Sequence, residues 1–261
     1  MNRKLININD SKKFKDQNIK EWHLNSDFWL EGNMRHINDV KGKTIEIILY
    51  LLNQRKKNSA EKKTLIDIGC GDGWLYRAIR DAKIDLIYYG IDFNEFFINT
   101  LKERYKTDAN AVFSTIDIEE NEIKDMEEKV DVAINAFNFF EIPDLEKAMM
   151  NTYKLIKNDG YLLILTIDSI TQLLSISEDE KMFYDYLEEY AEKRNKIGYK
   201  KRIDIRNKKT RKNYYGILYS LENYLAEGKK CNLVLQDYFE IINPARHTPQ
   251  LYQFILFKKV K

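Results

Sequence analysis

Short β-rich runs and longer helical stretches alternate along residues 64–167, and this alternation restricts the fold more than any other feature of the sequence. Strand–helix alternation of this kind is typical of a parallel sheet covered on both faces, and right-handed crossovers make it a doubly wound α/β fold. The expected strands are Leu65–Ile68, Leu86–Ile91, Ala111–Ile116, Val130–Ala136 and Tyr161–Ile167. The expected helices between them are Gly73–Lys83, Glu95–Tyr105 and Leu145–Ile156, the last stopped by Lys157–Gly160.

Two further runs near the end of the chain, Tyr238–Ile242 and Leu251–Phe257, are expected to be strands. Only a turn-sized link joins them, so we expect antiparallel neighbours. Together with the five parallel strands they predict a seven-stranded, mostly parallel sheet within a domain that spans residues 61–261.

Two segments stand outside the alternation. Residues 1–60 are expected to form an N-terminal helical cap, with amphipathic helices at Ser11–Leu30 and Gly42–Arg55. Residues 168–230 interrupt the pattern between the fifth and sixth strands, and they contain a polar helix predicted at Ser177–Lys196. We expect this helical and basic insert to act as a lid over one side of the site.

The window Lys193–Lys212 is strongly basic, with eleven Lys and Arg residues and one acid, in a chain of net charge +2. A solvated face is one interpretation. A second is a lid that captures a small substrate, the acceptor of a transferred group, that is phosphorylated or linked to a nucleotide, because Arg pairs well with phosphate. RNA binding is the third, favoured by the interleaved Tyr199, Tyr214 and Tyr215. The acidic remainder of the chain favours a small acceptor over nucleic acid.

Cys70 and Cys231 are the only cysteines, and they lie far apart in the sequence. A secreted disulfide scaffold needs more of them, so a reducing compartment is expected. No Cys or His cluster has zinc spacing, and no metal is expected. The first residues lack the apolar core of a signal peptide, and the longest apolar runs are much shorter than the ~20 residues of a membrane span. We therefore expect a soluble cytoplasmic protein, monomeric or homodimeric, that does not bind membranes.

A glycine-rich turn follows the first strand, with glycines at 69, 71 and 73 in the run Asp67–Gly73. Glycine allows a sharp turn and a close approach of the backbone to a ligand, and the helix that follows offers free N–H groups. Asp92 ends the second strand, where an acid is placed to accept hydrogen bonds from ribose hydroxyls. The dinucleotide fingerprint GxGxxG does not fit, because Trp74 stands where Gly or Ala is needed.

These landmarks resemble the class I S-adenosylmethionine (SAM)-dependent methyltransferase family, of the small-molecule type. The resemblance covers residues 64–167 well and 232–261 more loosely. The segments that carry it are Asp67–Gly73, Asp92, Ser114–Ile118, Asp131–Phe137, Phe140–Asp144 and Leu155–Leu162. The chain departs from the family pattern at Ile142, where His is common, and at Asn158 and Asp159, which replace Pro and Gly.

The resemblance implies a Rossmann-like methyltransferase fold, with SAM as cofactor and S-adenosylhomocysteine as product. It places the backbone of the glycine-rich turn against the methionine part of the cofactor, Asp92 on the ribose and Asp117 beside the adenine amino group. The full cofactor-binding set that it implies is Asp67, Gly69, Cys70, Gly71, Asp92, Phe93, Asp117, Ile118, Asn135 and Arg35. Cys70 itself is expected to be a packed side chain and not a nucleophile, since no His or Lys lies nearby in the sequence.

Three residues are candidates for the catalytic base that a hydroxyl or amine acceptor calls for: His247, His36 and Glu141. A histidine in the link between the last two strands is also compatible with plain surface. Glu141 is also compatible with an acid at a helix N-terminus, favoured by the dipole. Trp22 and Trp29 are seven residues apart and share a helical face, which either packs on the main domain or walls the methyl site.

The sequence therefore predicts a SAM-dependent methyltransferase that acts on an oxygen or nitrogen of a small anionic acceptor. Transfer from a sulfonium is an in-line displacement, so the protein mainly has to hold donor and acceptor at near-attack distance. Two alternatives stay open. One is an RNA methyltransferase that uses the basic segment 193–212, and the other is a non-catalytic SAM-binding subunit of a heteromeric enzyme.

Overall fold

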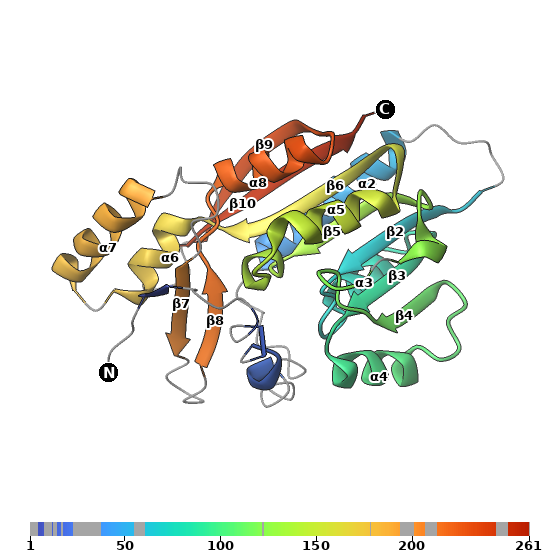
Figure 1. Ribbon diagram of the computed structural model, residues 1–261. Helices are drawn as coiled ribbons and strands as arrows, with labels where there is room; N and C mark the ends of the chain where they lie inside the picture. The colour runs from blue at the N-terminus through green and yellow to red at the C-terminus, as the bar shows by residue number, and fades with distance from the viewer. Residues whose placement is uncertain are drawn as a thin grey trace.

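The computed structural model describes residues 5–7, 12, 15–16, 18–22, 38–54, 61–121, 123–177, 179–193, 201–206, 213–243 and 250–260. Its centre is a seven-stranded sheet with the strand order β4-β3-β2-β5-β6-β10-β9 (Figure 1). The strands are β2 (Lys63–Ile68), β3 (Leu86–Asp92), β4 (Ala111–Thr115), β5 (Val130–Ala136), β6 (Ile156–Ile167), β9 (Leu233–Asn243) and β10 (Gln250–Lys259). The predicted seven-stranded, mostly parallel sheet is confirmed.

The first five strands of this sheet are parallel, and β10 runs antiparallel to both of its neighbours, β6 and β9. The chain enters at β2 in the middle of the sheet, runs outward to β4 and then returns to β5 on the other side of β2. The strand order therefore reverses between β2 and β5. In open α/β sheets a ligand binds at the carboxyl ends of the strands beside such a reversal.

Helices cover both faces of the sheet, as expected for parallel strands. One face is covered by α5 (Leu145–Leu155) and α8 (Leu221–Lys230), and the other by α2 (Asn38–Gln54), α3 (Trp74–Asp81) and α4 (Glu95–Arg104). Each face has its own buried apolar core, and the strands contribute alternate residues to the two cores. None of the helices in the part of the chain that the structure describes is long and apolar enough to cross a membrane.

Side-chain caps start α4 and α5, which leave the carboxyl ends of β3 and β5. Asn94 accepts a hydrogen bond from the backbone N–H of Phe96 at the start of α4, at 3.0 Å. Asp144 accepts one from Lys147 N–H at the start of α5, also at 3.0 Å. Short polar side chains at these positions satisfy N–H groups that the first turn leaves free. The loops after β3 and β5 are therefore held in place where they border the ligand side.

The boundary between α5 and β6 differs from the prediction. We expected the segment Lys157–Gly160 to separate the helix from a strand that begins at Tyr161, but β6 already begins at Ile156. Val130 pairs with Ile156, and the register then shifts before Val132 pairs with Tyr161. The turn residues are therefore accommodated as an irregularity within the strand pairing, and Asp159 takes a positive φ of 63° there.

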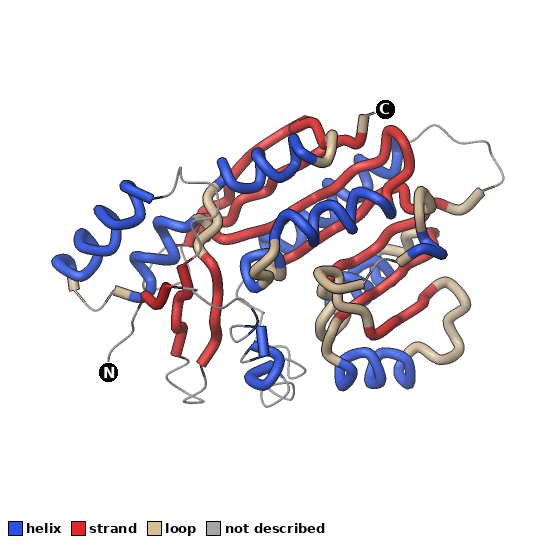
Figure 2. Tube along the Cα trace, viewed as in Figure 1, coloured by secondary structure: helices blue, strands red, loops and turns tan. Residues whose placement is uncertain are grey.

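The insert has more structure than the single predicted helix. It contains α6 (Ser169–Ile176), α7 (Glu180–Lys193), β7 (Lys201–Arg206) and β8 (Asn213–Ile217). The N-terminal strand β1 (Leu5–Asn7) pairs with β7, which gives a second sheet of order β1-β7-β8 (Figure 2). The helix predicted at Ser177–Lys196 corresponds to α7, whereas α6 and the strands β7 and β8 were not predicted. The N-terminal segment and the insert therefore share one small sheet.

Candidate cofactor site

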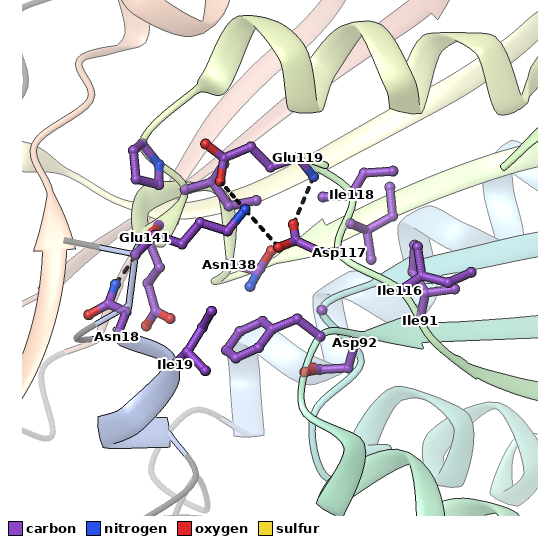
Figure 3. Close-up of a pocket in the computed structure, with 16 residues that line it drawn as sticks. Asn18, Ile19, Ile91, Asp92, Ile116, Asp117, Ile118, Glu119, Asn138 and Glu141 are labelled. Atoms are coloured by element: carbon purple, nitrogen blue, oxygen red, sulfur yellow. Dashed lines mark hydrogen bonds and ion pairs between the residues drawn. The ribbon is translucent and has the colours of Figure 1, made fainter. Parts of the chain in front are cut away.

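A pocket lies at the carboxyl ends of β2, β3, β4 and β5, beside the reversal of strand order (Figure 3). Four loops after these strands line it, and a short N-terminal segment closes one side. The lining residues are Lys15, Asn18, Ile19, Ile68, Gly69, Ile91, Asp92, Phe93, Ile116, Asp117, Ile118, Glu119, Asn138, Glu141, Ile142 and Pro143. Of the predicted site residues, Gly69, Asp92, Phe93, Asp117, Ile118 and Glu141 are among them.

The glycine-rich turn borders this pocket in the conformation that its glycines allow. Gly69, Gly71 and Gly73 all have positive φ angles, of 75°, 50° and 72°. The N–H groups of Gly69 and Cys70 both donate to the carbonyl of Ile91, at 2.8 and 2.9 Å. A Cβ atom at position 69 would lie 2.5 Å from Cγ of Asn138. Glycine at this position therefore leaves space for Asn138, which lines the pocket.

Asp92 is buried at the end of β3 and faces the pocket. Its Oδ2 accepts a hydrogen bond from Gly71 N–H at 2.9 Å, and its Oδ1 accepts one from Asn94 N–H at 2.8 Å. Burial raises the pKa of Asp92 to about 6, although these two backbone donors favour the ionised form. A carboxylate oxygen accepts more than one hydrogen bond, so each oxygen still has capacity for a ligand hydroxyl.

Asp117 follows β4 and forms an ion pair with Lys15, whose Nζ lies 2.7 Å from Asp117 Oδ2. The same ammonium lies 3.0 Å from Oε2 of Glu119 and 3.0 Å from Oε1 of Glu120. Burial opposes the charge of Lys15, but the bonds to Asp117, Glu120 and Glu119 outweigh it and raise the pKa of Lys15. A lysine from the N-terminal segment thus contacts the acid that the resemblance assigns to adenine.

Glu141 ends the short 3-10 helix η3 (Phe139–Glu141) after β5. Its Oε2 accepts a hydrogen bond from Trp22 Nε1 at 2.5 Å, and its carbonyl accepts one from Asn18 Nδ2 at 3.4 Å. Burial raises the pKa of Glu141 well above the ordinary range, although the Trp22 bond opposes the rise. Glu141 is an acid in the single turn of η3, and the longer helix α5 starts only at Leu145.

Four of the predicted cofactor residues do not line this pocket. Asp67 is fully buried and accepts a hydrogen bond from Tyr88 Oη at 2.5 Å. The Cys70 side chain is packed in the core, and burial raises its pKa well above the ordinary value, which agrees with the expectation of a packed thiol. Gly71 supports Asp92 through its N–H group.

Asn135, the fourth of these residues, is buried in β5 and braces the loop that follows. Its Nδ2 donates to the carbonyl of Ile68 at 3.1 Å, and its Oδ1 accepts from Phe139 N–H at 2.8 Å. It therefore connects the end of β2 to η3 and shapes the pocket from behind. Asn135 therefore supports the residues that line the pocket without lining it itself.

Arg35, His36, His247 and Trp29 lie outside the described residues. Trp22 is described, and its ring packs edge-on against Phe97 with centroids 6.2 Å apart. The contact with Phe97 agrees with packing on the main domain, and the indole N–H group also donates to the pocket residue Glu141.

Sequence reasoning missed the wall that the N-terminal segment contributes. Lys15, Asn18 and Ile19 line the pocket, and no local pattern in residues 1–60 marks them as ligand-facing. Asn138 was missed too, although it lies between two quoted motifs and directly follows the β5 exit residue Phe137. Phe137 has a positive φ of 64°, and this strained backbone at a site was not foreseen.

The pocket suits a nucleoside that carries a positive charge. Isoleucine side chains supply apolar surface for a flat base, and Figure 3 shows Ile19 on one side of the pocket with Ile91 and Ile116 on the other. Within the described residues, four acidic side chains line it against the one basic side chain of Lys15. No group of three or more His, Cys, Asp or Glu side chains in those residues is arranged to hold a metal ion.

Comparison with protein families gives a match to the methyltransferase domain model over residues 66–162. A malonyl-[acyl-carrier protein] O-methyltransferase of Acetivibrio thermocellus is 28% identical over 121 residues, which are 46% of this chain and 41% of that protein. The enzyme of the same name from Halalkalibacterium halodurans is 24% identical over 232 residues, or 83% of this chain and 82% of the relative. The chain therefore matches about two fifths of the first relative and most of the second.

Among solved structures, the chain is similar to the 1,6-didemethyltoxoflavin-N1-methyltransferase of Burkholderia thailandensis, which was crystallised with S-adenosylhomocysteine. The TM-score is 0.60 at 11% identity, with 99% of this chain and 96% of that chain covered. At this identity the likeness shows the fold. The domain match, the shared fold and an acidic pocket at the switch point agree with one another. Residues 66–162 therefore match a methyltransferase domain, and the chain has the fold of S-adenosylmethionine-dependent methyltransferases.

Proposed function

We propose that the chain transfers the methyl group of SAM to an oxygen of a small anionic acceptor, and that the accepting group is a carboxylate. The observation that carries the choice of oxygen is the pair of relatives named as O-methyltransferases of a malonyl group, one of them matched over 83% of this chain. A malonyl group attached to a carrier ends in a free carboxylate. Such an oxygen is already deprotonated at neutral pH, so its methylation needs no general base.

The connection between the insert and the pocket wall supports an acceptor site under the insert. Tyr219, at the end of the insert's small sheet, donates from its hydroxyl to the carbonyls of Ile142 and Pro143, at 2.8 and 3.0 Å. Strand β8 also lies against η3, which contains Glu141. Tyr219 and β8 therefore anchor the insert to the pocket wall, and we assign residues 168–230 and residues 1–60 to the cover of the acceptor side.

Charge supports an anionic acceptor in two ways. The insert carries the basic window 193–212, of which strand β7 contributes Lys201, Arg202 and Arg206. A basic segment near the site raises the local concentration of anions. Glu141 also fits, because burial raises its pKa well above the ordinary value, and a carboxyl that is protonated donates a hydrogen bond without repelling an anion. In this proposal Glu141 positions the acceptor, and His36 and His247 are needed as bases only for a hydroxyl or amine.

The test is methyl transfer from SAM labelled in its methyl group. The acceptors offered are short dicarboxylic acids, their thioesters on a carrier, primary amines and total RNA. We expect label in the carboxylate acceptors, and alkali should release it as methanol, because esters hydrolyse and N-methyl groups do not.

Alkali-stable label in amines would overturn the choice of a carboxylate. Label in RNA, with binding that weakens steeply as salt rises, would instead support the RNA methyltransferase alternative. If S-adenosylhomocysteine binds but no acceptor is methylated, the non-catalytic subunit alternative gains support.

A further inference from the structure

We propose that Asn138 selects the accepting group of the substrate. Its side-chain amide is held with the NH₂ group towards the pocket, where it donates a hydrogen bond to the carboxylate that is methylated and disfavours an amine. The inference rests on the proposed methyl transfer to a carboxylate, and it assigns a specificity-determining residue to that reaction.

The orientation of Asn138 depends on Asn135, and the backbone fixes the orientation of Asn135. The Nδ2 of Asn135 donates to the carbonyl of Ile68 at 3.1 Å, and its Oδ1 accepts from Phe139 N–H at 2.8 Å. A carbonyl only accepts and a backbone N–H only donates. Exchange of oxygen and nitrogen in the Asn135 amide would oppose like groups at both contacts, so a single orientation satisfies them.

The second hydrogen of Asn135 Nδ2 then determines the orientation of Asn138. Asn135 Nδ2 lies 3.3 Å from Asn138 Oδ1, and the reversed Asn138 amide would place two NH₂ groups against each other. Asn138 lines the pocket, and Figure 3 draws it among the residues that do so. No group in the described part of the chain accepts a hydrogen bond from Asn138 Nδ2, so both of its hydrogens are available to a ligand.

The glycine-rich turn provides the space for this amide. A Cβ atom at Gly69 would lie 2.8 Å from Asn138 Nδ2 and 2.5 Å from its Cγ. The NH₂ group therefore lies directly over Gly69, which also lines the pocket.

The order of the strands places Asn138 at the reacting end of the site. The strand ends follow one another as β4, β3, β2 and β5. With adenine beside Asp117 after β4 and ribose on Asp92 at the end of β3, the sulfonium end of SAM extends towards β2 and β5. Asn138 follows β5, on the same loop as Ile142 and Pro143, whose carbonyls Tyr219 of the insert contacts.

A hydrogen-bond donor at this end suits a carboxylate. Each carboxylate oxygen has two lone pairs, so one lone pair can accept from Asn138 while another attacks. That lone pair forms the new C–O bond, the C–S bond breaks with its electron pair left on sulfur, and no proton has to leave. An amine nitrogen needs its single lone pair for the attack, and its hydrogens require acceptors. A site with the wrong hydrogen-bond pattern rejects such an analogue strongly.

The experiment compares two acceptors of similar shape, with SAM labelled in its methyl group. They are the malonyl thioester of a short thiol and the β-alanyl thioester, in which an aminomethyl group replaces the carboxylate. In Asn138→Ala, kcat/KM for the malonyl thioester should fall about 10–100-fold, because a hydrogen bond to a charged group is lost. In Asn138→Asp it should fall more than about 100-fold, since two carboxylates then repel each other, and the ratio of amine to carboxylate methylation should rise.

Two measurements separate this effect from damage to the fold or to the cofactor site. The affinity of both variants for S-adenosylhomocysteine, measured by calorimetric titration, should stay within about threefold of the wild type. The matched control is Asn99→Asp, which makes the same change at an exposed position of α4 and should alter neither quantity.

Unchanged methylation of the malonyl thioester by Asn138→Asp would overturn the inference and leave the proposed function intact. An equal loss of S-adenosylhomocysteine affinity and of kcat/KM would overturn it too, because Asn138 would then serve the cofactor. A wild-type protein that methylates the amine and not the carboxylate would contradict the proposed function and this inference together.

Discussion

The backbone N–H of Gly71 donates a 2.9 Å hydrogen bond to Oδ2 of Asp92, so the glycine-rich turn after β2 is joined directly to the acid that ends β3. The two residues are 21 positions apart in the sequence, and the parallel pairing of β2 with β3 brings them together. The turn and the acid therefore form one unit of the pocket.

Replacement of this acid should damage cofactor binding more than it damages folding. In Asp92→Asn, the backbone N–H of either Gly71 or Asn94 faces an amide NH₂ group and loses its acceptor. The substitution also removes the negative charge that favours hydrogen bonds from ribose hydroxyls. We expect the affinity for S-adenosylhomocysteine to fall about 10–100-fold, as measured by calorimetric titration. The control is Asp81→Asn, an exposed acid at the end of α3, which should bind normally. Normal binding by Asp92→Asn would show that the acid does not touch the cofactor.

Cofactor affinity should also depend on pH through Asp92. Burial raises the pKa of Asp92 to about 6, so the carboxyl is ionised above that pH and protonated below it. Because the ionised form is the better acceptor, the affinity for S-adenosylhomocysteine should be constant from pH 7 to 8 and fall towards pH 5. The Asp92→Asn variant should lack this dependence. Parallel profiles for the two proteins would assign the effect to another group.

Gly69→Ala should destabilise the protein, because position 69 has a φ of 75° and an added Cβ would meet Asn138 at 2.5 Å. We expect a loss of roughly 1–3 kcal/mol in the free energy of unfolding, measured with urea. Gly42→Ala is the matched control, since nothing lies within 4 Å of a Cβ in that position within α2. There alanine should stabilise by about 0.5–1 kcal/mol. Equal effects of the two substitutions would contradict the described turn.

Tyr219→Phe tests the anchor of the insert. The Tyr219 hydroxyl supplies the hydrogen bonds to the carbonyls of Ile142 and Pro143, and it is buried. Without the hydroxyl, the two carbonyl groups lose this hydrogen-bond donor. The loss should lower the free energy of unfolding, measured with urea, by about 1–3 kcal/mol. Tyr50→Phe, at a side chain that is 59% exposed, should have no measurable effect. If both variants were as stable as the wild type, the anchor would contribute little.

Asp67 should make the protein less stable as the pH rises. Burial raises the pKa of Asp67 to about 7, far above its value in the unfolded chain, so the folded protein binds this proton more tightly. Stability from this group is therefore present near pH 4 and is lost as the pH rises towards 7.

In Asp67→Asn the amide oxygen can still accept from Tyr88. The free energy of unfolding of this variant, minus that of the wild type, should rise by roughly 3–4 kcal/mol between pH 4 and pH 8, as measured by urea unfolding. An unchanged difference across this range would show that Asp67 does not titrate there.

Local pattern was sufficient for the central sheet and for part of the site. The β-rich runs predicted all seven strands of that sheet. Strands that are buried between two layers of helices are short apolar runs, and such runs are easy to recognise in a sequence. The glycine-rich turn, Asp92 and Asp117 were found because their residue types and positions at strand ends imply their place at one edge. The three strands of the small sheet were missed, since β1 and β7 pair across nearly two hundred residues and have no pattern of their own.

The sequence by itself determined the doubly wound sheet, the reversal that locates the site and the strand-end residues that line it. Only the tertiary structure decided that Lys15 contacts Asp117, that Trp22 holds Glu141 and that Asp67 and Asn135 brace the site from behind. The reason is that strand ends lie together by the rules of parallel pairing, which periodicity reveals. The contacts of Lys15 and Trp22 join residues more than a hundred positions apart, and they depend on how a separate segment packs across the finished sheet.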